Sequence, residues 1–442
     1  CSSDRRNVER MWLTGRLAPD FKTIADFRKE NGKGIRNACK RFVGLCRELK
    51  LFTQSIVAID GSKFKAVNNR ERNYTQGKIE RRERELEENI QRYLDTLETA
   101  DRTQPAELQA KTDRLQDKIT KLRQKMKDLQ EIKVQLQAQP DGQISLTDPD
   151  ARAMTTHSMK GTAMVGYNVQ TVVDAQHHLI VAHEVTNSGS DRAQLSKMAL
   201  AAREAIAAPD LQAFADRGYY NSVEIKACED AGITTYVPKS MTSTSKAHGR
   251  YAKDDFIYIA RDDEYQCPQG NRATYRFTTT EDGLQMRAYL CSACPTCPIK
   301  PQGTTSKYRR IRRWEHEEVV DAVQQRLEKK PDAMMLRKRT VEHVFGTLKH
   351  WMGWTHFLMR RKVNVATEMS LHVLAYNLKR VMRILGVANL INAMRRAGGG
   401  GLIGAKASVF RCPWWCPKAF KRPADIQRFK DREKAPPSHV AG

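Results

Sequence analysis

The sequence predicts an α/β protein built on a mixed sheet with helices on its faces and interrupted by two insertions. Short apolar runs, typical of buried strands, alternate with amphipathic helical segments. A charge-dense stretch follows the first strand, and a cysteine-containing stretch without a clear period precedes the last helices. With 442 residues, the chain is long enough for two or three domains.

The composition favours a nucleic-acid partner. The chain has 76 Lys and Arg against 51 Asp and Glu, a formal charge of +25. Such an excess repels itself unless a polyanion neutralises it, although a merely basic surface is the other interpretation. No apolar run approaches the roughly 20 residues of a membrane helix, and no signal peptide opens the chain. We therefore expect a cytoplasmic protein without a membrane partner.

Residues 1–52 are predicted to form a helical N-terminal segment. A short amphipathic helix is expected at Thr23–Asn31, the glycines of Gly32–Gly34 break it, and a second helix follows. This outline is helix–turn–helix-like, but two short helices joined by glycine occur in many α-domains. Because the first residue is Cys1 and not Met, we expect a fragment or a truncated copy.

The first part of the sheet domain is predicted at residues 53–77. The apolar run Ile56–Ile59 suits a central strand, and the Asp60-Gly61 pair lets the chain bend. In residues 78–140, apolar side chains recur at alternating steps of three and four, the spacing of a coiled coil. Pro105 interrupts this spacing, so we expect two antiparallel helices, a coiled-coil hairpin that serves assembly rather than catalysis.

The sheet domain is predicted to continue over residues 141–240. The segments "GYNVQTVVD" and "HLIVAHEVT" predict a hairpin, and a helix with Asp191 near its start follows. The segment "LQAFADRGYYN" predicts a strand that ends in Asp216, before a further helix and strand. The remaining predicted parts are a cysteine-containing insertion at 241–313, the C-terminal helices of the catalytic domain at 314–392, and a basic, mobile tail at 393–442.

Three acidic motifs resemble those of the DDE transposases of bacterial insertion sequences. They are "AIDGSKF" around Asp60, "ADRGYYN" around Asp216 and "RKRTVEHVFGTLK" around Glu342. The likeness covers about residues 8–390 and is closest to the branch with a coiled-coil arm after the first Asp and the phrase "MSLHVLAYNLKR" near the end. The resemblance implies an RNase-H-like catalytic domain, with a mixed sheet and flanking helices, that cuts and transfers DNA strands.

The resemblance also implies that Asp60, Asp216 and Glu342 bind the catalytic metal, Mg²⁺ or Mn²⁺. Carboxylates suit such hard ions, and two ions roughly 3.5–4 Å apart can neutralise charge on both the attacking and the leaving oxygen. Taken singly, the three acids are also explained as a turn former, a helix cap and a surface acid. Together and in this order they favour catalysis. Competing acids are Asp148, Asp150, Asp174, Asp191 and Glu368.

Basic residues crowd around the third acid, and we expect them to contact DNA phosphates. They are Arg337, Lys338, Arg339, Lys349, Arg360, Arg361 and Lys362. Nearby, Trp351 and Trp354 either stack on a frayed base or belong to the core, which is the commoner place for large aromatic side chains.

Four cysteines of the second insertion have two interpretations, a structural zinc site or free thiols. They are Cys267, Cys291, Cys294 and Cys297. Thiolates with two-residue gaps can close a tetrahedral zinc site, which would stabilise the insertion and take no part in catalysis.

The sequence therefore predicts metal-dependent cleavage and strand transfer of DNA at the terminal inverted repeats of an insertion sequence, and into target DNA. We expect a homodimer, because two ends must be joined, that works in the bacterial cytoplasm near the nucleoid. Two alternatives remain: a nuclease of the same fold that only hydrolyses DNA, and a truncated copy that only binds it.

Overall fold

The computed structural model describes residues 20–53, 55–101, 109–139, 141–155, 164–240, 245–353 and 355–397. Residues 1–380 form one compact unit and residues 381–442 a second. The start of the predicted N-terminal segment and most of the predicted tail lie outside the described residues. Among those that are described, no helix is both long and apolar enough to cross a membrane.

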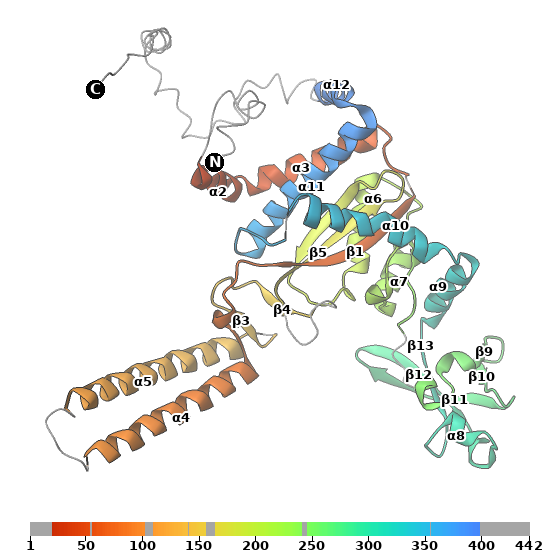
Figure 1. Ribbon diagram of the computed structural model, residues 1–442. Coiled ribbons are helices and arrows are strands. Elements are labelled where there is room, and N and C mark those ends of the chain that lie inside the picture. Colours follow the sequence, from red (N-terminus) through yellow and green to blue (C-terminus); the bar gives the residue numbers. More distant parts are fainter. Residues whose placement is uncertain are drawn as a thin grey trace, which may run out of the picture. The chain divides into compact units, whose positions relative to one another are not determined.

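A six-stranded mixed sheet forms the centre of the first unit (Figure 1). Its strands follow the order β4-β5-β1-β7-β8, and β6 pairs with β5. Strand β1 runs antiparallel to β5 but parallel to β7, which in turn runs parallel to β8. The strands are β1 (Ile56–Lys65), β4 (Arg152–Met154), β5 (Met164–Asp174), β6 (Ile180–Thr186), β7 (Gln212–Phe214) and β8 (Thr234–Tyr236). The hairpin predicted from the two apolar segments is therefore β5 and β6.

Helices follow and separate these strands. They are α2 (Phe21–Glu30), α3 (Gly32–Glu48), α6 (Leu195–Ile206), α7 (Ser222–Asp230), α9 (Glu317–Lys329), α10 (Ala333–Gly346), α11 (Lys362–Leu385) and, in the second unit, α12 (Val387–Ala397). Three boundaries differ from the predictions. The break between α2 and α3 falls at Asn31. The glycines belong to the first turn of α3 and do not separate the two helices. Helix α6 begins after Asp191, and β7 ends before Asp216.

The core between the sheet and helices α10 and α11 is apolar and aromatic. Ala58 and Phe64 of β1 belong to the same buried cluster as Val344 of α10 and Met369 of α11. Residues of a strand alternate between its two faces, so Asp60, which lies between Ala58 and Phe64 at even spacing, points to the α10 side. The packing of α10 therefore decides what Asp60 meets.

The first insertion is a pair of helices, α4 (Gln76–Asp101) and α5 (Gln109–Gln137), which extend side by side (Figure 1). They run antiparallel, because Lys133 pairs with Glu83 at 2.9 Å while Lys118 lies 5.5 Å from the ring centre of Tyr93. The regularly spaced apolar side chains lie between the two helices, where Leu129 is buried. Coiled-coil geometry and a role in assembly stay predictions.

The second insertion contains a five-stranded antiparallel sheet in the order β13-β12-β11-β10-β9. Its strands are β9 (Ile257–Ile259), β10 (Glu264–Gln266), β11 (Arg272–Glu281), β12 (Leu284–Cys291) and β13 (Arg310–Trp314). A small cluster around Phe256, Tyr265 and Tyr289 forms its core. The sequence shows no clear period here because most side chains of β11 are exposed or half-buried.

Asn377 of α11 joins this helix to the edge strand β6. Its Oδ1 accepts a hydrogen bond from the N–H of Ile180 at 2.9 Å, and its Nδ2 donates to the carbonyl of Ile180 at 2.8 Å. Asn377→Ala leaves both buried groups unsatisfied, so we expect the free energy of unfolding to fall by about 2–4 kcal/mol in urea denaturation. The control is Asn364→Ala on the same helix, where the amide bonds a carbonyl near the surface and the loss should stay below about 1 kcal/mol. Equal losses in both variants would contradict the role of Asn377.

Candidate active site

Asp60 lies in β1 just beyond the point where β7 stops pairing with that strand. The parallel pairing covers Ile56–Ala58 and Gln212–Phe214, whereas β5 continues to pair with β1 as far as Lys65. One edge of β1 is therefore released from β7 at Asp60. The Oδ1 of this residue accepts a hydrogen bond from the N–H of Gly61 at 3.0 Å.

Asp216 lies two residues after β7 and caps a short 3-10 helix, Arg217–Tyr219. Its Oδ1 accepts a hydrogen bond from the N–H of Gly218 at 2.8 Å. The cap interpretation thus applies to this short helix and not to α7, whose first turn is capped by Asn221. Because β1 and β7 are parallel neighbours, an acid within β1 and an acid just after β7 reach the same edge of the sheet.

Arg337 of α10 joins the two aspartates. Its Nη2 lies 2.5 Å from Oδ1 of Asp60 and 3.5 Å from Oδ2 of Asp216. The Arg337 side chain is only 13% exposed, so this guanidinium faces the sheet and not the solvent. The sequence predicts it as a phosphate contact; in the structure it is the counter-ion of two carboxylates, and the phosphate contact stays a prediction.

Asp60 is electrostatically perturbed. Burial raises its pKa to about 6, the charge of Arg337 opposes this shift, and the carboxylates of Asp216 and Asp191 add to it. Perturbation by burial together with specific charged partners is typical of functional sites, although structural ion pairs produce it too.

Glu342, the third predicted acid, lies on the same helix as Arg337 but is exposed. Its carboxylate is 3.9 Å from the ammonium group of Lys338. Among the described residues it makes no hydrogen bond or ion pair with either aspartate. Lys349 follows seven residues later on the same flank of the helical path, and its Nζ donates to Oγ of Ser62 at 2.7 Å. The flank that carries Glu342 therefore runs beside β1, while the carboxylate itself points to solvent.

Asp191, which the sequence marks only as a competing acid, lies at this site. Its Oδ1 accepts hydrogen bonds from Nδ2 of Asn168 and Nε2 of Gln170, each at 2.7 Å. A Cβ on Gly61 would lie 2.7 Å from the same oxygen, so the glycine allows Asp191 to approach β1 closely. The available signal was the two amides in the otherwise apolar strand "GYNVQTVVD", since buried polar side chains require partners.

The donors at this site are hard oxygen ligands, the kind that Mg²⁺ or Mn²⁺ prefers. Their chemistry therefore fits a divalent cation. As the side chains stand, however, no set of three or more His, Cys, Asp or Glu residues in the described ranges is arranged to hold a metal. A physical reason is Arg337, whose guanidinium lies between Asp60 and Asp216 and supplies the positive charge there.

The other predicted DNA contacts differ in exposure. Lys338, Arg339, Arg360 and Arg361 are exposed, and Lys349 and Lys362 are half-buried. The backbone before α11 is held by two of the competing acids: the N–H of Arg361 donates to Asp148 at 3.0 Å, and that of Lys362 donates to Asp150 at 2.8 Å. The basic side chains thus extend from a fixed backbone.

The structure describes only one of the two tryptophans beside α10. Trp351 is 84% exposed, so the core interpretation is wrong for this residue. Trp354 lies outside the described residues.

Comparison with known proteins bears on the C-terminal part of the site. A family model described as "Transposase DDE domain" matches residues 266–382. Residues 266–382, hereafter the transposase DDE segment, are therefore similar to this family. This segment includes Glu342, Arg337 and the basic loop before α11, whereas Asp60, Asp191 and Asp216 precede it. The chain matches no curated protein.

One solved structure is similar to the chain, the cryo-EM structure of the piggyBac transposase synaptic complex with hairpin DNA. The two are 10% identical, with a TM-score of 0.23. The comparison covers 66% of this chain and 55% of that chain, so this protein spans about half of the length of that relative.

The four cysteines of the zinc interpretation lie inside the transposase DDE segment. Cys291 and Cys294 are buried, and Cys267 and Cys297 are half-buried; none of the four forms a disulfide bond. Burial, with a smaller contribution from neighbouring Cys294, raises the pKa of Cys291 to about 11. They form no metal-holding group in the described part of the chain, and the zinc site stays a prediction.

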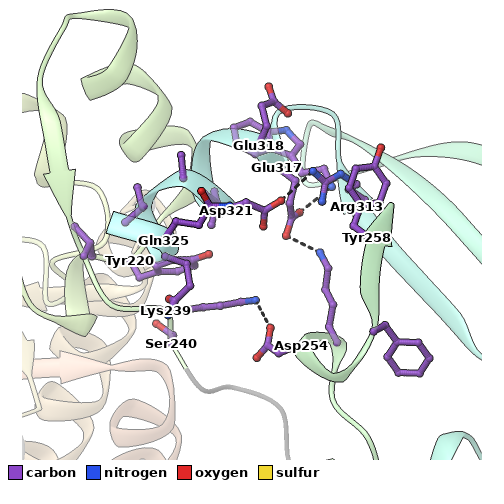
Figure 2. A pocket seen from close by; sticks show the side chains of 18 of the residues that line it. Tyr220, Lys239, Ser240, Asp254, Tyr258, Arg313, Glu317, Glu318, Asp321 and Gln325 are labelled. Carbon is purple, nitrogen blue, oxygen red and sulfur yellow. Dashed lines mark hydrogen bonds and ion pairs between the residues drawn. The ribbon is translucent and has the colours of Figure 1, made fainter. Parts of the chain in front are cut away.

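A cavity of about 1280 Å³ adjoins the residues that follow Asp216 (Figure 2). Arg217 and Tyr220 line one side of it, and α9 with the second insertion lines the other. Lys239 pairs with Asp254 at 2.8 Å across its wall, and Lys253 pairs with Glu317 at 2.6 Å. Both ion pairs thus lie in the cavity wall, and the pair of Lys253 and Glu317 attaches the second insertion to α9.

Glu317, at the start of α9, is the most buried acid of these pairs. Burial alone would raise its pKa, but the charge and hydrogen bond of Lys253 and the N–H of Trp314 outweigh this and lower it. A lowered carboxyl pKa stabilises the fold above the ordinary value of about 4.5, and this stabilisation is lost as the pH falls through the folded-state pKa.

We therefore expect Glu317→Gln to lower the free energy of unfolding by about 1–3 kcal/mol near neutral pH, and by less at about pH 3.5. Urea denaturation at the two pH values measures this difference. The matched control is Glu318→Gln in the same helical turn, whose side chain is 63% exposed and should change stability little at either pH. A Glu317→Gln deficit that grows on acidification would contradict the assignment.

Proposed function

We propose that the chain is a DDE-type transposase that cleaves and transfers DNA strands at the ends of a bacterial insertion sequence in a metal-dependent reaction. One observation carries the proposal. Asp60 and Asp216, 156 positions apart in the sequence, share the guanidinium of Arg337, and Arg337 belongs to the transposase DDE segment. The site and the matched segment are therefore physically one unit.

The strand order supports the RNase-H-like domain that the resemblance implies. β1 lies at the centre, with β5 and β6 antiparallel on one side and β7 and β8 parallel on the other. This arrangement brings the first acid within β1 and the second acid after β7 to the same edge of the sheet. The helix with the third acid packs on the face toward which Asp60 points.

In this proposal Asp60, Asp216 and Glu342 hold the metal. A bound Mg²⁺ or Mn²⁺ pair supplies positive charge at the attacking and leaving oxygens of the phosphodiester. The chain's own groups prepare the ligands: the N–H of Gly218 orients Asp216, and the N–H of Gly61 orients Asp60. Glu342 has to turn from its pairing with Lys338 toward the two aspartates, a rotation that its exposed side chain permits.

Exposed basic side chains beside the site bind the DNA backbone in the proposed function. Arg360 and Arg361 project from a backbone that Asp148 and Asp150 fix, so little conformational freedom is lost when a phosphate is bound. Since a transposase joins two ends, we propose a homodimer, for which the α4–α5 arm is an available assembly element.

The three acids are tested with DNA duplexes that carry the sequence flanking the reading frame, in the presence of Mg²⁺ or Mn²⁺. We expect Asp60→Ala, Asp216→Ala and Glu342→Ala each to reduce cleavage by at least about two orders of magnitude while DNA binding persists, because metal ligands act in the reaction and not in the grip on DNA. The control is Asp210→Ala, an exposed acid that should cleave like the wild type.

Other outcomes identify other functions. Cleavage that persists in all three variants contradicts the site. Cleavage without transfer of the cut 3′ end into a target plasmid indicates a nuclease of the same fold. A wild-type protein that binds these duplexes and never cuts them indicates a copy that only binds DNA.

The basic loop is tested by the salt dependence of DNA binding. Arg360→Ala and Arg361→Ala should each reduce the slope of log affinity against log salt by about 1, since each lost phosphate contact releases one counterion fewer. The matched control is Arg276→Ala, an exposed arginine on β11, which should leave the slope unchanged. A slope that falls equally in all three variants would show that net charge matters and the loop does not.

A further inference from the structure

Asp191 is the acid at the site that the Asp–Asp–Glu resemblance leaves without a role. It lies in the loop between β6 and α6, and one of its carboxylate oxygens, Oδ1, is fixed by the amide donors of Asn168 and Gln170. The other oxygen, Oδ2, makes no hydrogen bond among the described residues. A carboxylate with one oxygen oriented by donors and the other free has the arrangement of a metal ligand supported from behind.

The free oxygen of Asp191 and the carboxylate of Asp216 both lie near Gly218. A Cβ built on Gly218 would lie 3.0 Å from Oδ1 of Asp216 and 3.9 Å from Oδ2 of Asp191. Both carboxylates therefore border the small space left by this glycine. On the other side, Gly61 leaves room for Asp191 to reach β1 beside Asp60.

The three aspartates form one electrostatic group. The side chain of Tyr219 lies beside them: a Cβ built on Gly61 would lie 3.1 Å from the Tyr219 hydroxyl and 2.7 Å from Oδ1 of Asp191, and the N–H of Tyr219 donates to the carbonyl of Asp216 at 3.1 Å. Arg337 pairs with Asp60 and Asp216, but no basic side chain in the described part of the chain pairs with Asp191. The group thus has more negative than positive charge in direct contact.

A second observation concerns an unsatisfied oxygen beside Asp191. Asn168 is only 1% exposed, and its Oδ1 is buried without a hydrogen-bond partner, while its Nδ2 donates to Asp191. A buried carbonyl oxygen left unsatisfied is costly, and an amide oxygen is a good ligand for a hard cation. The unsatisfied atom belongs to the side chain that orients Asp191.

We propose that Asp191 is a further carboxylate ligand of the divalent cation held at Asp60 and Asp216, with Asn168 beside it as the residue that orients it. This inference rests on the proposed function, because it concerns the same metal. In this inference, Asp60, Asp191 and Asp216 of the sheet region form the cation site. Glu342 of α10 joins that site afterwards. Arg337 is the internal counter-ion of that site in the absence of metal.

The decisive variant is Asp191→Asn. Its side-chain oxygen can still accept both amide donors, so the loop keeps its hydrogen bonds, but the negative charge is lost and an NH₂ group replaces the free oxygen. Mn²⁺ binding to the full chain without DNA is measured by calorimetry, together with urea denaturation in the absence of metal. We expect at least a tenfold weaker Mn²⁺ affinity and an unchanged or higher stability. Asp191→Ser, which removes the carboxylate without adding an amide, should weaken Mn²⁺ binding similarly.

Two further variants serve as controls for Mn²⁺ binding. Asp60→Asn should weaken Mn²⁺ binding at least as strongly, and the exposed Asp210→Asn should bind Mn²⁺ like the wild type. Wild-type affinity in both Asp191 variants overturns the inference, and so does a wild-type chain that binds no Mn²⁺. A loss of stability equal to the loss of affinity in both variants also overturns it, because Asp191 would then be a structural residue only.

Failure of the inference and failure of the proposed function are distinguishable. If the Asp191 variants lose Mn²⁺ binding but the wild type never cuts DNA, the cation site stands and the transposase proposal fails. If the wild type cuts, Asp60→Asn does not, and Asp191→Asn binds Mn²⁺ and cuts normally, the proposed function stands and the role of Asp191 fails.

Discussion

The bridge from Arg337 to Asp60 and Asp216 is the interaction on which the site depends. Two carboxylates close together in a poorly hydrated place repel each other, and burying one without a partner costs several kcal/mol. The guanidinium offsets both costs, yet burial still raises the pKa of Asp60 to about 6. Without α10 in place, Asp60 would lose the positive charge that opposes this shift.

The apolar packing of α10 in turn positions the guanidinium. Phe345 lies 6.2 Å, between ring centres, from Phe64 of β1, and Phe64 lies 5.9 Å from Phe357 after the helix. These ring contacts fix the rotation of α10 about its own axis. As a result, Arg337, about two turns before Phe345, faces Asp60. Core packing and charge pairing are thus coupled: a change in the aromatic cluster would be felt at the acids.

The central strands could be predicted from the sequence, but the contacts that complete the site could not. The apolar runs of β1, β5 and β6 are strong local signals. Arg337, by contrast, lies in a run of three basic residues, and composition alone assigns all three to DNA. Arg337 differs from its two basic neighbours because it lies on the same helix face as Val341, Val344 and Leu348. This spacing places that face on the core.

Asp191 left only an indirect signal in the sequence, the two amides of β5. Its partners Asn168 and Gln170 lie 23 and 21 positions earlier, and hydrogen bonds over such separations leave no local pattern. The sheet of the second insertion was missed because β11 has neither the alternation nor the apolar content of a buried strand. In both cases tertiary contacts, not local propensity, decide the structure.

Arg337 has two roles, counter-ion in the structure and predicted phosphate contact, and its Nη2 lies within 3.5 Å of both carboxylates. In the proposed function a divalent cation brings new positive charge to Asp60 and Asp216, and a phosphodiester brings negative charge to the same place. The carboxylates would then pair with the cation instead of the guanidinium, and the guanidinium would be free to pair with the phosphate. Arg337 thus holds Asp60 and Asp216 together in the structure, and in the proposed function it already lies beside the site when DNA arrives.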